Sequence, residues 1–147
     1  MADTTTVKYL RPLNLLDGDV DEHSGNRHIT VQLTGISDGT GETDVTKIRL
    51  SDLRGPNGRQ PAKTAVERIK GQVRGLDVLL EWDRAPSALI TRIGASGNEA
   101  HVDHDWRSIG GNIDPGGDDR TGDILLTTTN ADVGDIYTLT LDIRLKD

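Results

Sequence analysis

The stretch DIYTLTLDIRLKD (Asp135–Asp147) decides the fold class, because apolar and polar side chains alternate along most of its length. Five apolar residues occupy every second position: Tyr137, Leu139, Leu141, Ile143 and Leu145. Threonine, aspartate and arginine occupy the positions between them. A period of two with β-branched and aromatic residues is typical of a strand with one buried face. We therefore expect a half-buried strand here.

The same alternation recurs earlier in the chain, most clearly in residues 28–35 (HITVQLTG) and 76–83 (LDVLLEWD). The positions expected to face inward are Ile29, Val31, Leu33, Leu76, Val78, Leu80 and Trp82. Shorter candidate strands cover residues 4–10, 43–50, 87–93, 98–106 and 122–129. Clusters of Gly, Asp, Asn and Pro separate them. This pattern predicts an all-β fold, an antiparallel β-sandwich or jelly-roll-like single domain.

Residues 61–73 (PAKTAVERIKGQV) fit two structures. Pro61 is typical of the first position of a helix, and the apolar residues that follow are spaced by four, three and four positions. In a strand, Ala65, Ile69 and Val73 share a face, and Val66 points away unless a bulge intervenes. We expect a strand, because the surrounding pattern is all-β.

Composition limits the class of protein. The chain has 147 residues, enough for one domain or a domain with an arm. Only 33% of residues are hydrophobic and 3% aromatic, so burying surface against copies of the chain or another protein would add stability. There is no Cys, hence no disulfide or thiolate site. No apolar run suits a signal peptide or membrane span, so we expect a soluble protein made in a cytoplasm.

Charge is unevenly distributed. The net charge of −7 argues against direct nucleic-acid binding, yet residues 47–74 are strongly basic. The basic residues of this segment are candidates for docking on an acidic partner: Lys47, Arg49, Arg54, Arg59, Lys63, Arg68, Lys70 and Arg74. The alternative is that they are solvated side chains that flank strands.

The stretch HVDHDW (residues 101–106) combines two histidines and two aspartates, which are common metal ligands. Strand alternation sends His101, Asp103 and Asp105 to one face and Val102, His104 and Trp106 to the other. Because the two histidines then lie on opposite faces, we expect a polar outer row with Val102 and Trp106 facing the core. A metal site here is the minor alternative.

A glycine-rich loop gathers the other candidate metal ligands, and these are weak candidates for calcium: Asp114, Asp118, Asp119 and Asp123. Their spacing matches no known calcium loop. The acidic residues 17–22 fail the EF-hand pattern, because Glu22 stands where glycine is required. Nucleophile-elbow, P-loop and zinc-helix motifs are absent. We expect neither an enzyme nor a cofactor.

Four segments of the second half of the chain form a recognisable series: LLEWD (79–83), IGG (109–111), TGDILLTTT (121–129) and GDIYTLTLDIR (134–144). In this order they resemble small virion proteins of tailed bacteriophages. The resemblance covers about residues 64–147. It implies a β-sandwich head decoration, or cement, protein on the outer capsid surface, with the major capsid protein as partner. Such proteins are commonly trimers. Residues 1–60 lie outside the resemblance, and we expect them to form extra strands or an arm that contacts the capsid or a neighbouring subunit. Residues 61–147 would form the sandwich core.

Two other functions stay open. The chain is alternatively a tail or head-fibre module that binds host carbohydrate, with or without calcium, through its acidic loops and Trp106. A cupin-like metalloenzyme using His101 and His104 is the least favoured, because such sites gather histidines from separate strands.

Overall fold

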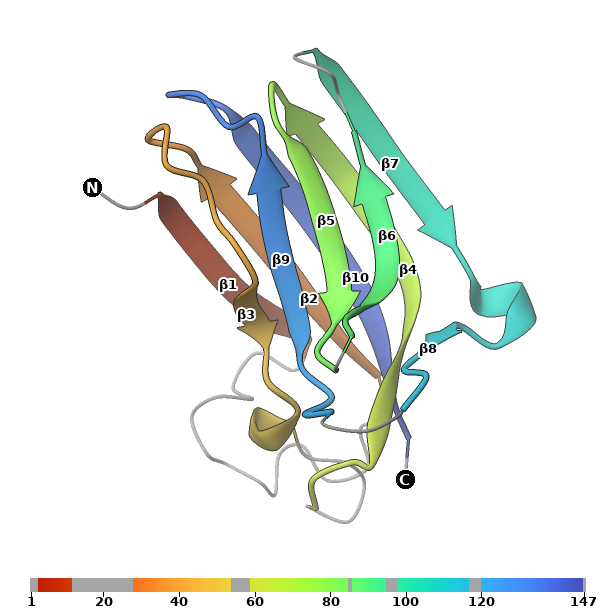
Figure 1. The fold of residues 1–147 in the computed structure, drawn as a ribbon. Helices are drawn as coiled ribbons and strands as arrows, with labels where there is room; N and C mark the ends of the chain where they lie inside the picture. Colours follow the sequence, from red (N-terminus) through yellow and green to blue (C-terminus); the bar gives the residue numbers. More distant parts are fainter. Residues whose placement is uncertain are drawn as a thin grey trace.

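The fold comes from a computed structural model, which describes residues 3–11, 28–53, 59–84, 86–94, 98–116 and 120–146, apart from the side chains of Tyr9 and Arg11. Two antiparallel sheets lie face to face as a β-sandwich (Figure 1). This confirms the predicted all-β, antiparallel fold. No helix among the described residues has the length and apolar character needed to cross a membrane.

The larger sheet has the strand order β1-β2-β10-β4-β7, with the short β8 paired to β4. Its strands are β1 (Thr4–Arg11), β2 (His28–Ile36), β10 (Ile136–Lys146), β4 (Lys63–Arg74), β7 (Glu99–Asp105) and β8 (Asn112–Ile113). The smaller sheet has the order β3-β9-β5-β6. Its strands are β3 (Val45–Ile48), β9 (Ile124–Thr129), β5 (Asp77–Trp82) and β6 (Ala88–Ile93). The 3-10 helices η2 (Leu50–Asp52) and η3 (Arg107–Ile109) follow β3 and β7.

The core lies between the sheets and is built from the positions that alternation predicted. Every residue expected to face inward on β2, β5 and β10 is at most 2% exposed, and so is Leu76, which precedes β5. The Tyr137 ring lies against Gly35 of β2, where a Cβ atom would come within 2.3 Å of the ring. Gly35 therefore makes room for the one aromatic side chain of β10.

Residues 63–74 form strand β4, as expected, and a bulge explains their helix-like spacing. The pairing of β4 with β10 skips one residue: Asp142 pairs with Arg68, whereas Ile143 pairs with Val66. Glu67 is the extra residue. Both Val66 and Ile69 are fully buried, because the bulge resets the alternation between them.

Strands from both parts of the chain share the sheets. From the first sixty residues, β2 pairs with β10 and β3 pairs with β9. Whether residues 1–60 act as a separate arm stays a prediction.

Candidate functional site: the basic end of the sandwich

Lys47, the first predicted docking residue, is not on the surface. Its side chain is 3% exposed, and its Nζ lies 2.5 Å from Oε2 of Glu42, whose side chain is 6% exposed. The pairing of β3 with β9 shifts register between Thr46 and Ile48, so Lys47 lies in an irregular part of the strand. Burial makes its ammonium inaccessible to a partner, which corrects the sequence-based assignment.

Arg68 lies on the outer face of β4 opposite strand β7, and it is already paired. Its Nε and Nη2 donate to the carboxylate of Asp103 at 3.0 and 2.8 Å. These hydrogen bonds raise the pKa of Arg68 and lower the pKa of Asp103. Lys70, which is exposed, is the cross-strand neighbour of Asp103. This part of the predicted basic region is therefore countered by acidic residues of β7.

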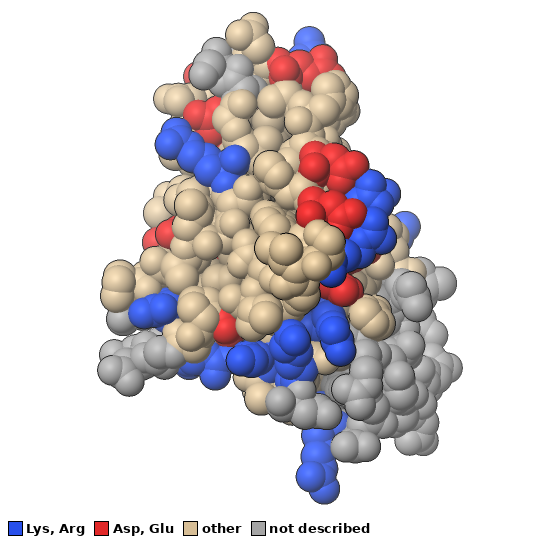
Figure 2. Space-filling model, turned by 90° about the vertical axis from the view of Figure 1, so that its right-hand side faces the viewer, with Lys and Arg blue, Asp and Glu red and all other residues tan. Residues whose placement is uncertain are grey.

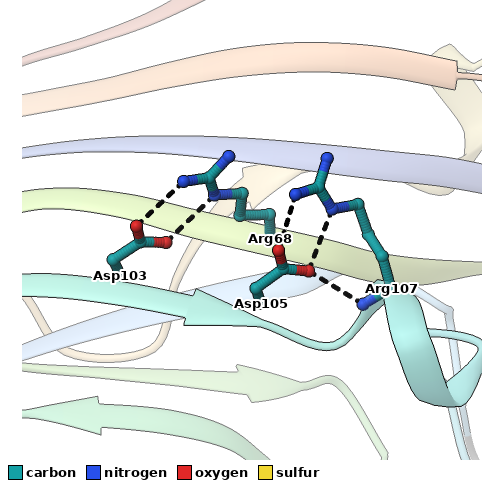
Figure 3. A network of polar contacts seen from close by, with 4 residues as sticks. All are labelled: Arg68, Asp103, Asp105 and Arg107. Atoms are coloured by element: carbon teal, nitrogen blue, oxygen red, sulfur yellow. Dashed lines mark hydrogen bonds and ion pairs between the residues drawn. The ribbon is translucent and has the colours of Figure 1, made fainter.

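Arg107 of η3 makes a second pair of the same kind with Asp105 (Figure 3). Its Nε and Nη2 donate to the Asp105 carboxylate at 2.9 and 2.6 Å, and its backbone N–H donates at 3.0 Å. Together these bonds hold the pKa of Asp105 well below that of an ordinary aspartate.

The outer row predicted for HVDHDW exists, and arginines hold its two aspartates. His101 is exposed, with Nε2 3.4 Å from Oε1 of Glu99. On the other face Val102 is buried, Trp106 packs against the core and His104 stacks on Trp106 with ring centroids 5.5 Å apart. Among the described residues no three His, Asp or Glu side chains are grouped so as to hold a metal ion.

The described calcium candidates have structural partners. Asp114 is 3% exposed; it accepts from Nη2 of Arg120 and from the backbone N–H of Gly116, both at 2.8 Å. Asp123 accepts from the backbone N–H of Leu50 at 2.9 Å, at the start of η2. Asp118 and Asp119 lie outside the described residues.

The remaining basic candidates divide between the two ends of the sandwich. The end of the sandwich where β3 ends and β4 begins carries Arg49, Arg59 and Lys63. Arg74, at the end of β4, lies at the opposite end (Figure 1). Arg49, Arg59 and Arg74 are exposed, and Lys63 is half-buried. Arg54 lies outside the described residues.

Four basic residues that the sequence analysis missed join the first group. We define the basic end as Arg49, Arg59, Lys63, Arg84, Arg120, Arg144 and Lys146. Lys63 pairs with Lys146 in the β4–β10 register, and Arg120 donates to the Ala62 carbonyl at 3.0 Å. Arg84 follows Asp83, which is hydrogen-bonded to Thr121 and Asp123. Antiparallel pairing brings these distant segments together, so charge counting along the chain could not find them.

The opposite end is acidic. We define the acidic end as Asp3, Asp38, Asp77, Glu99, Asp132 and Asp135. The backbone N–H of Asp38 donates to Asp3 at 3.0 Å, that of Ser37 donates to the Asp135 carbonyl at 2.8 Å, and Gly75 donates to Asn98 at 2.8 Å. Figure 2, which looks onto the β6 and β7 edges, shows most of the Lys and Arg side chains of this side in the lower half. Charge is thus separated along the strand direction.

A polar hollow of about 340 Å³ lies on the outer face of the larger sheet. His28, Thr30, Glu67, Arg107 and Asp142 line it, together with Ile29. The bulge in β4 places Glu67 there, with Oε1 2.8 Å from Nδ1 of His28, and Thr30 donates to Asp142 at 2.9 Å. Its hydrogen-bond donors and acceptors suit a polar ligand.

Comparison of the chain with protein-family models, curated protein sequences and solved structures found no match.

Proposed function

We propose that the protein is a structural virion component that docks on the outer surface of an assembled bacteriophage capsid and stabilises it by bridging shell subunits. Its partner is the major capsid protein, and it works without catalysis or a cofactor, as a homo-oligomer made in the host cytoplasm. The phage-like segments and the all-β fold support this role. The observation that carries the docking mode is the basic end, which suits an acidic surface on the shell.

Buried donor groups also lie at this end of the sandwich. Four buried side-chain atoms of the described residues have no hydrogen-bond partner: Oγ1 of Thr64, Nε1 of Trp82, Nε of Arg84 and Nε of Arg120. All four belong to residues near the ends of β4 and β5 or the start of β9, and each carries a hydrogen to donate. Because these atoms are buried, they are not available to a docking partner, and the docking surface consists of the exposed basic side chains alone.

Charge reversal tests the docking mode. Shells assembled from the major capsid protein of the same source are mixed with the protein, and binding is measured by sedimentation. The double variant Arg49→Glu, Lys63→Glu should bind much more weakly. The matched control is Arg74→Glu with Arg92→Glu. Arg92 lies near the end of β6, with Nη2 3.8 Å from Oδ2 of Asp77 at the acidic end. This control changes the net charge equally and should bind like the parent. Equal weakening by both variants would exclude the basic end, and failure of the parent to bind any such shell would exclude the proposed function.

The polar hollow favours a second candidate, a head-fibre or tail module that binds host carbohydrate. Glu67, Asp142 and Arg107 offer acceptors and a donor to sugar hydroxyls. A glycan array, read with and without calcium, tests it. Binding that Glu67→Gln and Asp142→Asn abolish would support this candidate over shell docking, and an array without signal would dismiss it.

A further inference from the structure

Glu42 connects the two sheets from a buried position. Its backbone N–H donates to Oγ1 of Thr128 at 2.8 Å, and its carbonyl accepts from the Thr128 N–H at 2.9 Å, which ties it to β9. Its Oε1 accepts from the Tyr137 hydroxyl of β10 at 2.6 Å. The remaining oxygen, Oε2, faces Nζ of Lys47 at 2.5 Å. The carboxyl group is therefore held in one orientation.

Lys47 and Glu42 form an ion pair that is almost dry. Their side chains are 3% and 6% exposed. Two charges removed from water lose much hydration energy, and their mutual attraction offsets that loss only in part. Transfer of one proton from the ammonium to the carboxylate removes both charges, and it leaves a neutral amine beside a carboxylic acid.

Tyr137 is the third residue of this buried group. Its hydroxyl points at the carboxyl oxygen that does not contact Lys47. Burial, followed by the hydrogen bond to Glu42, raises the pKa of Tyr137 far above its usual value, so the phenol keeps its proton. A fixed O–H donor at this oxygen stabilises negative charge that develops on it when a nucleophile attacks the carboxyl carbon.

We propose that Lys47 and Glu42 condense spontaneously to an isopeptide bond that joins strand β3 to the preceding loop. The neutral Nζ of Lys47 attacks Cδ of the protonated Glu42 carboxyl, and the developing charge on Oε1 is held by the Tyr137 hydroxyl. Oε2 then leaves as water, taking its own proton and one from the attacking nitrogen. A neutral amide and one water molecule result, and no oxidant or co-reactant is needed.

Contact between the two groups lowers the barrier to this reaction, and burial favours its uncharged product. In bulk water an ionised amine and carboxylate do not condense to a useful extent. Here the two groups are in contact, and well-oriented intramolecular reactants reach effective concentrations of about 10⁵–10⁸ M. The product amide is uncharged, so it avoids the desolvation cost of the buried ion pair.

Mass spectrometry of the denatured, full-length protein tests the bond. The crosslinked chain should weigh less than its sequence by one water molecule. Trypsin should fail to cut after Lys47, because the amine is acylated, and should release residues 28–49 as one peptide with the same deficit. A full sequence mass together with complete cleavage after Lys47 would overturn the proposal.

Two variants separate the bond from other causes of water loss. Dehydration of the Asp38–Gly39 peptide to a succinimide gives the same deficit in the same peptide. Lys47→Arg keeps the buried charge but lacks the amine, so the mass deficit should disappear. Persistence of the deficit would assign it to Asp38 and refute the crosslink.

Tyr137→Phe tests the role of the phenol. It should slow the reaction by about 10²–10³-fold, as loss of a preorganised oxyanion donor does. An unchanged rate would remove Tyr137 from the mechanism.

Discussion

Lys47 and Arg68 come from one basic stretch, yet their surroundings differ completely. Lys47 is buried against Glu42, whereas Arg68 lies at the surface against Asp103. Residue type alone predicted the same role for both. Which side of a strand each residue faces, and which acidic residue lies opposite, depend on local register, and the register of β3 is irregular at Lys47.

Replacement of Lys47 should be costly. Lys47→Met leaves the Glu42 carboxylate buried without its cation and without the proposed crosslink, and we expect a loss of at least about 3–5 kcal/mol in the free energy of unfolding, measured with urea. Adding Glu42→Gln should restore part of it, because no unpaired charge remains. Lys70→Met, at an exposed site, should change stability by no more than about 0.5 kcal/mol. Similar values for Lys47→Met and Lys70→Met would contradict the burial of Lys47.

Gly71 should tolerate no side chain. Its φ is +151°, and a Cβ atom there would lie 1.9 Å from the Thr138 carbonyl oxygen of the adjacent strand. Gly71→Ala must push β4 away from β10, so we expect a loss of about 2–6 kcal/mol from strain and overpacking. Gly110 also has a positive φ, +88°, but no atom lies within 4 Å of its Cβ position. Gly110→Ala should therefore cost only about 1–2 kcal/mol, and thermal melting of both variants checks the difference.

At the scale of elements, the bulge in β4 does two things. It turns both Val66 and Ile69 toward the core, and it places Glu67 in the polar hollow beside His28. In the sequence the apolar residues of this segment are spaced as they would be on one face of a helix. The reason is that the extra residue of the bulge interrupts the period-two alternation of the strand. Only pairing with β10 distinguishes the two.

The pairing of Asp105, at the end of β7, with Arg107 of η3 should make the stability of the fold depend on pH. Hydrogen bonds from the Arg107 side chain and then its backbone lower the pKa of Asp105 from the ordinary 3.8. A lowered pKa in the folded state adds stability above the unfolded pKa, and this stability is lost as pH falls through the folded value. The urea midpoint should therefore drop less between about pH 5 and about pH 2 in Asp105→Asn than in the parent. Arg107→Ala should behave likewise; a parent-like drop in both variants would contradict the assignment.

At the scale of the molecule, the strands run between two ends of opposite charge. The basic end collects residues from the segments that flank β3, β4, β5, β9 and β10. A chain with a net charge of −7 thus presents, in its described part, one region where basic residues predominate. Such an arrangement orients a protein as it approaches a charged surface.

Ion-exchange chromatography measures this charge separation without a partner. The variants Arg49→Glu, Lys63→Glu and Arg74→Glu, Arg92→Glu have equal net charge. The second pair extends the acidic end, so at low ionic strength it should bind an anion exchanger more tightly and elute at higher salt. The difference should shrink as salt screens the charges. Identical elution would argue against two oppositely charged ends.

For β2, β5 and β10 the amino-acid pattern alone was enough to predict the strand and the side of it that faces the core. Period-two alternation located the inward positions of β2, β5 and β10, because one face of every strand must be apolar to be buried. It also placed Val102 and Trp106 toward the core, which excluded a metal site that uses both histidines of that strand.

Which charged groups meet depends on strand pairing, which the amino-acid pattern does not reveal. The pairs Lys47–Glu42 and Arg68–Asp103, and the contacts that bring Arg120 to Ala62, join residues through register and strand order. The alternation of apolar and polar residues predicts neither register nor strand order, since it describes each strand separately from its neighbours. The basic end was therefore predicted in part: Arg49, Arg59 and Lys63 lie there, whereas Lys47 lies in the core. Its other members, Arg84, Arg120, Arg144 and Lys146, could be recognised only from the antiparallel pairing that brings their segments to one end of the sandwich.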